Sequence, residues 1–274
     1  MRPSIGTRSA QYLIVFIFTV ICVYPLILMV LSSFKSNLDI FQHPFALPTS
    51  FHLETYRQLL GDMPFFHYFL NSVIVSCASV LMILVFASLA AFYLARFTFK
   101  WTGTVFFLFL IGMMIPIKLG IVPLFLLMKH LHLLDSLWSL IFMYTAIGMP
   151  LSILILTGFF KTLPLELEES ARIDGSGNLG ILWHVLLPLM RPALGTVMII
   201  NFIEAWNDFF FPLIFIQDEM KKTIPVGMLS LFGEYSANWS VLFAGLTLSS
   251  IPMLVLFFLA SRQFMDGMTQ GALK

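Results

Sequence analysis

Long apolar runs alternate with short polar segments along the whole chain. A helix needs about 20 mostly apolar residues to cross the hydrocarbon core of a bilayer, and six runs approach or exceed that length. The six predicted spans are residues 12–34, 67–95, 104–128, 136–159, 193–215 and 239–260. We therefore predict an all-α membrane protein with six transmembrane helices.

The polar segments between these runs divide the chain. Arg2 and Arg8 precede the first run, as they would in a secretory signal. The run is longer than the ~7–15 apolar residues of a signal, so we expect an uncleaved anchor. We predict a cytoplasmic N-terminal segment (1–11), one transmembrane domain (12–261) and a cytoplasmic tail (262–274), with external loops over 36–66 and 218–238.

The composition agrees with a membrane protein. Charged residues make up 11% of the chain and apolar residues 59%, with a mean hydropathy of +0.94, whereas a soluble domain has about 25% charged residues. A net charge of +1 argues against nucleic-acid binding, which needs a basic surface. Cys22 and Cys77 lie inside apolar runs, where a thiol behaves as a small hydrophobe. We expect no disulfide, metal site or cofactor.

The Lys and Arg residues predict which side of the membrane each loop faces. Nine of the 15 fall on the side of the N-terminus: Arg2, Arg8, Arg96, Lys100, Lys161, Arg172, Arg191, Arg262 and Lys274. Five fall on the other side, namely Lys35, Arg57, Lys129, Lys221 and Lys222, and Lys118 lies within the third run. Because cytoplasmic loops carry the excess of Lys and Arg, we predict a multi-pass protein of the cytoplasmic membrane with both termini in the cytoplasm.

The segment between the fourth and fifth runs holds the densest group of charges. Thr162 is suited to cap a helix, Pro164 to its first turn and Gly175 to its end. A helix over 164–174 is short, and helices below about 12–15 residues are marginal alone in water. It therefore needs support from the body of the protein or from a partner.

Two residue patterns lie within this predicted helix. Glu168 and Arg172 have the i,i+4 spacing and order that favour an ion pair. One face consists of mostly small residues at helical spacing: Leu167, Ser170, Ala171 and Asp174. This face suits insertion into a cleft. The alternative is an interfacial segment that only joins two spans, and the residues alone favour the two interpretations about equally.

The fifth run carries polar side chains, which are costly in a spanning helix and normally face a cavity or a partner. A single helical stripe is predicted to carry Asn201, Glu204, Asp208 and Phe211, with Trp206 and Asn207 beside it. Carboxylates and amides bond sugar hydroxyls and aromatic rings stack on sugar rings, so this region is suited to line a sugar path. The alternative, given equal weight, is that these groups bond neighbouring helices or a partner.

Three further polar residues lie in the predicted spans. Lys118 stands between Pro116 and Pro123, which free backbone carbonyls. We expect its ammonium to bond locally or to reach toward the interface, rather than to line a path. Asn71 and Ser72 are expected to make interhelical hydrogen bonds.

The sequence lacks a pattern typical of an enzyme. It contains neither G-x-x-x-x-G-K-[ST] nor H-E-x-x-H. His130 and His132 have no further ligands nearby in sequence, and no base can be assigned to Ser176. An enzyme is not expected. A secondary transporter or channel that couples ions through the intramembrane carboxylates remains an alternative.

One motif resembles a known family. The pattern E-x-A-x3-G-x9-V-x-L-P is carried by Glu169, Ala171, Gly175, Val185 and the pair Leu187–Pro188, and it is similar to the EAA loop of permeases in binding-protein-dependent ATP-binding cassette (ABC) importers. Ser170 replaces the usual alanine, and Val185 an isoleucine. Residues 70–76, 115–125, 204–215 and 265–274 further resemble maltose-type carbohydrate permeases.

The resemblance implies a function and a set of partners. The EAA loop, about residues 162–192, would form a cytoplasmic coupling helix between spans 4 and 5 that sits in a groove on an ATPase subunit. The partners would be a second homologous permease, two ATPase subunits, an extracytoplasmic sugar-binding protein, the sugar and membrane lipid. ATP hydrolysis on the partner chains would drive alternating access. A permease for another small solute is the alternative within the family.

The resemblance also assigns candidate residues. The ATPase contact would use Glu168, Glu169, Ser170, Ala171, Asp174 and Gly175. The translocation pathway is predicted from the polar and aromatic residues of the fifth run themselves, and would use Glu204, Trp206, Asn207, Asp208 and Phe211. The binding-protein contact would use Gly233, Glu234 and Tyr235.

Overall fold

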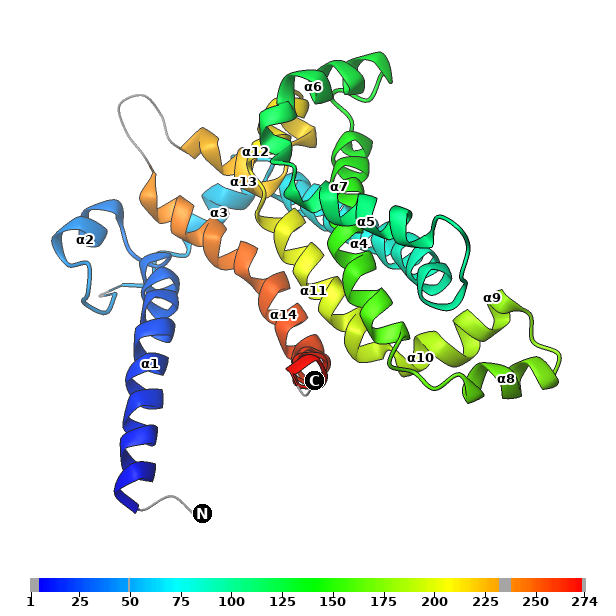
Figure 1. Cartoon of the computed structure of the whole chain (residues 1–274). Helices are drawn as coiled ribbons and strands as arrows, with labels where there is room; N and C mark the ends of the chain where they lie inside the picture. Colours follow the sequence, from blue (N-terminus) through cyan, green and yellow to red (C-terminus); the bar gives the residue numbers. More distant parts are fainter. Residues whose placement is uncertain (1–4, 49, 232–237, 273–274) are drawn as a thin grey trace. The chain divides into compact units, whose positions relative to one another are not determined.

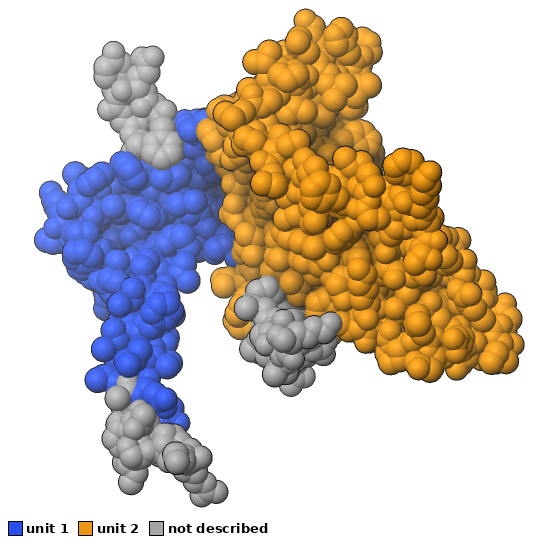
Figure 2. Space-filling view, viewed as in Figure 1, with its two compact units in different colours: residues 1–66, 227–251 blue, residues 67–226, 252–274 orange. Residues whose placement is uncertain are grey.

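The computed structural model describes the backbone of residues 5–48, 50–231 and 238–272, and the side chains of 11–48, 50–231 and 238–258. These residues form helices joined by turns and loops, and no strand occurs among them (Figure 1). The chain divides into two compact units, residues 1–66 with 227–251 and residues 67–226 with 252–274 (Figure 2). The predicted helical membrane fold is confirmed.

The first unit contains one long apolar helix and a folded loop. Its elements are α1 (Ile5–Ser32), α2 (Asn37–Gln42), α3 (Glu54–Gly61), η4 (Met228–Leu231) and the first part of α14 (Trp239–Ala272). The α1 side chains from Tyr12 to Leu26 are exposed, as lipid-facing side chains would be. In the loop, the buried Lys35 ammonium donates to the carbonyls of His43 and Pro44 at 3.0 and 3.1 Å, so its donors are used where water is excluded.

The second unit contains most of the remaining helices. In chain order they are α4 (Phe65–Arg96), α5 (Thr102–Met114), η1 (Ile117–Gly120), α6 (Ile121–His130), α7 (Leu137–Phe160), α8 (Glu166–Ile173), α9 (Asn178–Gly180), η2 (Ile181–Leu186, a π-helix), α10 (Leu187–Leu189), α11 (Arg191–Asn207), α12 (Phe210–Phe215), η3 (Glu219–Lys221) and α13 (Ile224–Gly227). Helices α4, α13 and α14 extend across the boundary between the units.

Among the described residues, four helices are long and apolar enough to cross a membrane: Gln11–Ser32, Phe65–Arg96, Leu137–Phe160 and Trp239–Phe258. Two bent pairs bring the number to six if each pair forms one span. They are Thr102–Met114 with Ile117–His130, bent by 82°, and Asn178–Leu189 with Arg191–Asn207, bent by 81°.

The third and fifth predicted spans are interrupted in the structure. Ile115 is extended (φ −78°, ψ 119°) because a residue that precedes proline avoids the α conformation, and the helix breaks there. Further on, α11 ends at Asn207, and Asp208 is extended (ψ 130°) before α12 begins. A single helical stripe from Asn201 to Phe211 therefore does not exist.

Small residues let the central helices of the second unit approach closely. Gly148 of α7 faces α4 and α11, and an added Cβ would lie 2.6 Å from Ile83 Cδ1 and overlap Asn201 Oδ1. The Asn201 amide donates to Ser152 Oγ at 3.0 Å and to the Val197 carbonyl at 2.8 Å. The buried amide is thus hydrogen-bonded across the helix pair.

Polar contacts mark the two ends of the second unit. At one end, Asn71 donates to the carbonyls of Met220 and Lys222 at 2.8 and 3.0 Å, and the Ile224 N–H donates to Ser72 Oγ at 2.9 Å. These two residues hold a loop rather than a neighbouring span, in contrast to the expected interhelical bonds. At the other end, Arg96 Nη2 donates to the Leu163 carbonyl at 2.9 Å.

Candidate functional site

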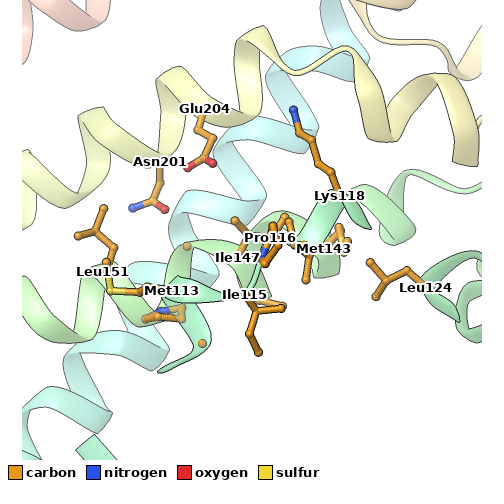
Figure 3. Close-up of a pocket in the computed structure, with 15 residues that line it drawn as sticks. Met113, Ile115, Pro116, Lys118, Leu124, Met143, Ile147, Leu151, Asn201 and Glu204 are labelled. Carbon is orange, nitrogen blue, oxygen red and sulfur yellow. The ribbon is translucent and has the colours of Figure 1, made fainter. Parts of the chain in front are cut away.

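A cavity of ≈ 680 Å³ lies where the α5–α6 pair bends against α7 and α11. Its walls are mostly apolar and include Met113, Met143 and Leu151. Asn201 and Glu204 come from neighbouring turns of α11, and Lys118 reaches toward that helix from η1 (Figure 3). An apolar cavity with a few polar groups is the usual form of a small-molecule site.

The break at Pro116 places Lys118 on this cavity. Because the helix stops at Met114 and restarts as a 3₁₀ turn at Ile117, Lys118 lies on the cavity wall. Its Nζ lies 5.4 Å from the centroid of the Phe210 ring, within the range of a cation–π interaction. The cavity therefore combines an ammonium, a carboxylate and an amide.

Four of the five predicted pathway residues lie elsewhere than on the cavity wall. Trp206 is buried, stacks on Phe202 with ring centroids 5.5 Å apart and meets Phe69 edge-on. Asp208 accepts from the Tyr144 hydroxyl at 2.9 Å and from the Phe211 N–H at 3.0 Å.

The other two of these four residues, Phe211 and Asn207, also lie away from the cavity wall. Phe211 is buried against Tyr144, and the exposed Asn207 amide donates back to the Ile203 carbonyl. Only Glu204 of the predicted five lines the cavity. Sequence reasoning gave too little weight to Lys118, although the two prolines around it signalled a break.

Helix α8 is the second candidate surface, and the structure splits its predicted contact residues into two faces. Glu168 and Ala171 are buried against the rest of the unit, and Ala171 packs in a core cluster with Phe92, Phe160 and Leu182. Glu169, Ser170, Asp174 and Gly175 are exposed. Ile173 is 86% exposed, an unusual position for a large apolar side chain beside charged neighbours.

The start of α8 differs from the sequence prediction, whereas its end agrees with it. Leu165 occupies the N-cap without a side-chain hydrogen bond, and the Thr162 hydroxyl instead donates to the Phe159 carbonyl. Gly175 ends the helix with a positive φ of 84°. The predicted Glu168–Arg172 pair is wrong, because Glu168 pairs with Arg96 and Arg172 donates to Asn178 at 3.4 Å.

A third polar group joins the loop after α12 to the start of α7. Asp135 accepts from the backbone N–H groups of Asp218 and Gln217 at 2.9 and 3.0 Å, and Lys221 lies 3.3 Å from Asp218 and 3.6 Å from Asp135. The Asp218 N–H bond is the main cause that lowers the pKa of Asp135. The hydrogen bond from Lys222 is the main cause that lowers the pKa of Glu219, with the Tyr68 hydroxyl second.

The predicted binding-protein contact, Gly233, Glu234 and Tyr235, lies outside the described residues. Within the described part of the chain, no three His, Cys, Asp or Glu side chains gather as metal ligands would.

The apolar helices, the half-polar cavity between them and the exposed surface of α8 define a polytopic membrane protein of the transporter class. The model of the family described as "Binding-protein-dependent transport system inner membrane component" matches residues 83–269. The chain belongs to this family, as the EAA-type motif predicted, and is the permease component of an ABC importer.

Relatives and a solved structure agree with this assignment. The chain is 35% identical to the probable ABC transporter permease protein YurM of Bacillus subtilis, over 97% of this chain and 89% of the relative. It is 31% identical to the diacetylchitobiose uptake system permease protein NgcG of Streptomyces coelicolor, also over 97% and 89%. The fold matches a chain of a bacterial ABC transporter involved in alginate import, with a TM-score of 0.85, 23% identity and coverage of 96% of this chain and 99% of that chain.

Proposed function

We propose that this permease carries a sugar or oligosaccharide across the cytoplasmic membrane by alternating access, driven by ATPase subunits on separate chains. Carbohydrate is the substrate class in the name of the Streptomyces relative. The motifs at 115–125, 204–215 and 265–274 resemble carbohydrate permeases over much of the chain. The partners in this proposal are a second permease, two ATPase subunits and an extracytoplasmic sugar-binding protein.

The observation that carries the proposal is that α8 is buried on one face and exposed on the other. Its inner face, with Glu168 and Ala171, is fixed to the permease, while its outer face presents Glu169, Ser170 and the 86%-exposed Ile173. An eight-residue helix with one anchored face can transmit force between two bodies only if a partner covers the other face. We assign that partner as an ATPase subunit, and the outer face with Asp174 and Gly175 as the contact.

The cavity is the proposed sugar path through this subunit. The Glu204 carboxylate and Asn201 amide are suited to bond hydroxyl groups, and Lys118 adds a donor to the same space. Trp206, Asp208 and Phe211 contribute in this proposal by fixing the end of α11 and the start of α12 behind the cavity. Asn207 is exposed beside them.

The proposed topology has six crossings with both termini in the cytoplasm. Arg96 at the end of α4 contacts Leu163 just after α7, so these two helices end on the same side. Asn71 near the start of α4 and Asp135 before α7 both contact residues 217–222, so they start on the same side. The chain must therefore cross once between Arg96 and Leu137, and the excess of Lys and Arg favours the α8 side as cytoplasmic.

Cysteine crosslinking combined with uptake tests the proposal. In a chain with Cys22 and Cys77 replaced by serine, Ile173→Cys should crosslink to an ATPase subunit, while the matched exposed control Gln217→Cys should not. Reconstituted complex should take up a labelled oligosaccharide only with ATP and the binding protein. Uptake without ATPase subunits would instead indicate an ion-coupled carrier, and ATP-driven uptake of a non-sugar solute alone would refute the substrate class.

A further inference from the structure

The structure contains a buried ion pair that joins α8 to a membrane-spanning helix. Arg96 Nε lies 2.5 Å from Glu168 Oε1, and both side chains are 6% exposed. Arg96 is in the last turn of α4 and Glu168 in the first turn of α8. A cation at a helix C-terminus and an anion at a helix N-terminus each also interact favourably with the helix dipole.

The same guanidinium makes a second bond to the connecting segment. Arg96 Nη2 donates to the carbonyl of Leu163, at 2.9 Å, in the segment between α7 and α8. One planar group therefore ties together the end of α4, the segment after α7 and the start of α8. The planar, forked guanidinium of arginine can make both bonds at once. The ammonium of lysine is a point charge on a flexible chain and does not fix the direction of either bond.

Apolar packing surrounds this ion pair. Ala171, one turn beyond Glu168, belongs to the same buried apolar cluster as Phe92 of α4, Phe160 of α7 and Leu182 of η2. Water is largely excluded from the Arg96 and Glu168 side chains, so removing either charge leaves the other buried without its partner. The ion pair joins α8 to α4, and the inner face of α8 is buried in an apolar cluster, whereas its outer face is exposed.

We propose that Arg96 is a positioning residue that makes α8 and the end of α4 move as one rigid body, so that force on α8 reaches the spanning helices. This inference rests on the proposed contact between α8 and an ATPase subunit. It assigns a role to a residue outside the EAA-type motif. Without the Arg96–Glu168 pair, α8 would tilt or slide on its apolar face, and ATP hydrolysis would move α8 without moving α4.

The test uses the assembled complex in proteoliposomes with Arg96→Gln, Arg96→Lys and Glu168→Gln. The matched control is Lys100→Gln, a cation four residues beyond Arg96 that is exposed beside Trp101. Sugar uptake per ATP hydrolysed should fall about fivefold or more in Arg96→Gln, fall less in Arg96→Lys and stay at the wild-type value in Lys100→Gln. Uptake per ATP hydrolysed should fall in Glu168→Gln as much as in Arg96→Gln.

A distance measurement separates positioning from a purely structural role. Spin labels at Tyr93→Cys on α4 and Glu166→Cys on α8, in the cysteine-free background, should give one distance in the nucleotide-free and ATP-bound wild type. In Arg96→Gln the distribution of distances between the two labels should broaden, or its mean should change when nucleotide binds. The proposal is overturned if Arg96→Gln and Glu168→Gln keep the wild-type uptake per ATP and a single distance, even if less complex assembles. Failure of the wild-type complex to couple ATP to uptake would instead refute the proposed function.

Discussion

Gly148 shows how a single residue sets the distance between two helices of the permease. Alanine in a helix is ordinarily about 1 kcal/mol more favourable than glycine. At Gly148 the added methyl would overlap Asn201 Oδ1 and approach Ile83 Cδ1 to 2.6 Å. Asn201 cannot move freely, because its amide is bonded to Ser152 and Val197.

We therefore expect Gly148→Ala to destabilise the permease by about 1–3 kcal/mol, the usual cost of overpacking a core, and to lower the melting temperature of the purified complex. Gly158→Ala in the same helix is the control, since nothing lies within 4 Å of its added Cβ, and it should melt no lower than the wild type. Equal melting temperatures for the two variants would contradict the close approach at Gly148.

At the scale of residues, the sequence predicted which polar side chains matter better than it predicted what each of them contacts. Glu204 lines the cavity, as the cost of a charge in a spanning helix suggested, whereas the equally polar Asp208 accepts from the Phe211 N–H at the start of α12. Glu168 was predicted to pair with Arg172, the neighbour visible in the sequence. Its partner is Arg96, which is distant in sequence and can be identified only once α4 and α8 are packed together.

At the scale of elements, the end of α8 depends on one backbone conformation. Gly175 has a φ of 84°, its N–H donates to the Arg172 carbonyl at 3.0 Å, and the Ser176 N–H donates to the Ala171 carbonyl at 2.9 Å. These two bonds form a Schellman motif, which satisfies carbonyls at the helix end and favours glycine.

Gly175→Ala should weaken this end of the helix by about 1 kcal/mol, because a residue with a Cβ is strained at positive φ. The amide of Ser176 should then exchange its hydrogen roughly fivefold faster, a fold-change equivalent to about 1 kcal/mol. Gly177→Ala is the matched control, with a φ of −75° and open space around the added Cβ. If Ser176 exchanges equally fast in both variants, the left-handed turn does not stabilise α8.

The elements themselves were predictable from apolar runs, and their breaks only in part. The break before Pro116 has a visible cause, since proline restricts the residue before it. The break at Asp208 also has a signal, because Pro212 has no N–H to donate to the Asp208 carbonyl four residues earlier and its ring clashes with that carbonyl. The sequence does not show that the Asp208 carboxylate accepts from the Tyr144 hydroxyl and the Phe211 N–H. Apolar runs therefore predicted where candidate spans lie, and the described residues contain four unbroken apolar helices, or six spans if each bent pair is one span.

At the scale of the whole molecule, the proposed relative directions of α4, the α5–α6 pair and α7 rest on contacts at the two ends of the second unit. Lys100 follows α4, Thr162 follows α7, and the contact between Arg96 and Leu163 places these segments at one end. Gln217 is bonded to Asp135, which lies a few residues after His130. In the proposed topology, the bent pair between Lys100 and His130 therefore crosses the membrane rather than returning to the side from which it entered.

Single cysteines at Lys100, His130, Thr162 and Gln217, in a background with Cys22→Ser and Cys77→Ser, test this topology. A membrane-impermeant maleimide applied to intact right-side-out spheroplasts should label His130→Cys and Gln217→Cys. Lys100→Cys and Thr162→Cys should react only after the membrane is opened, because the side richer in Lys and Arg faces the cytoplasm. Labelling of Lys100→Cys and His130→Cys from the same side would make the bent pair a re-entrant loop. If that side were the cytoplasm, α7 would carry α8 to the external side, where no ATPase subunit could reach it.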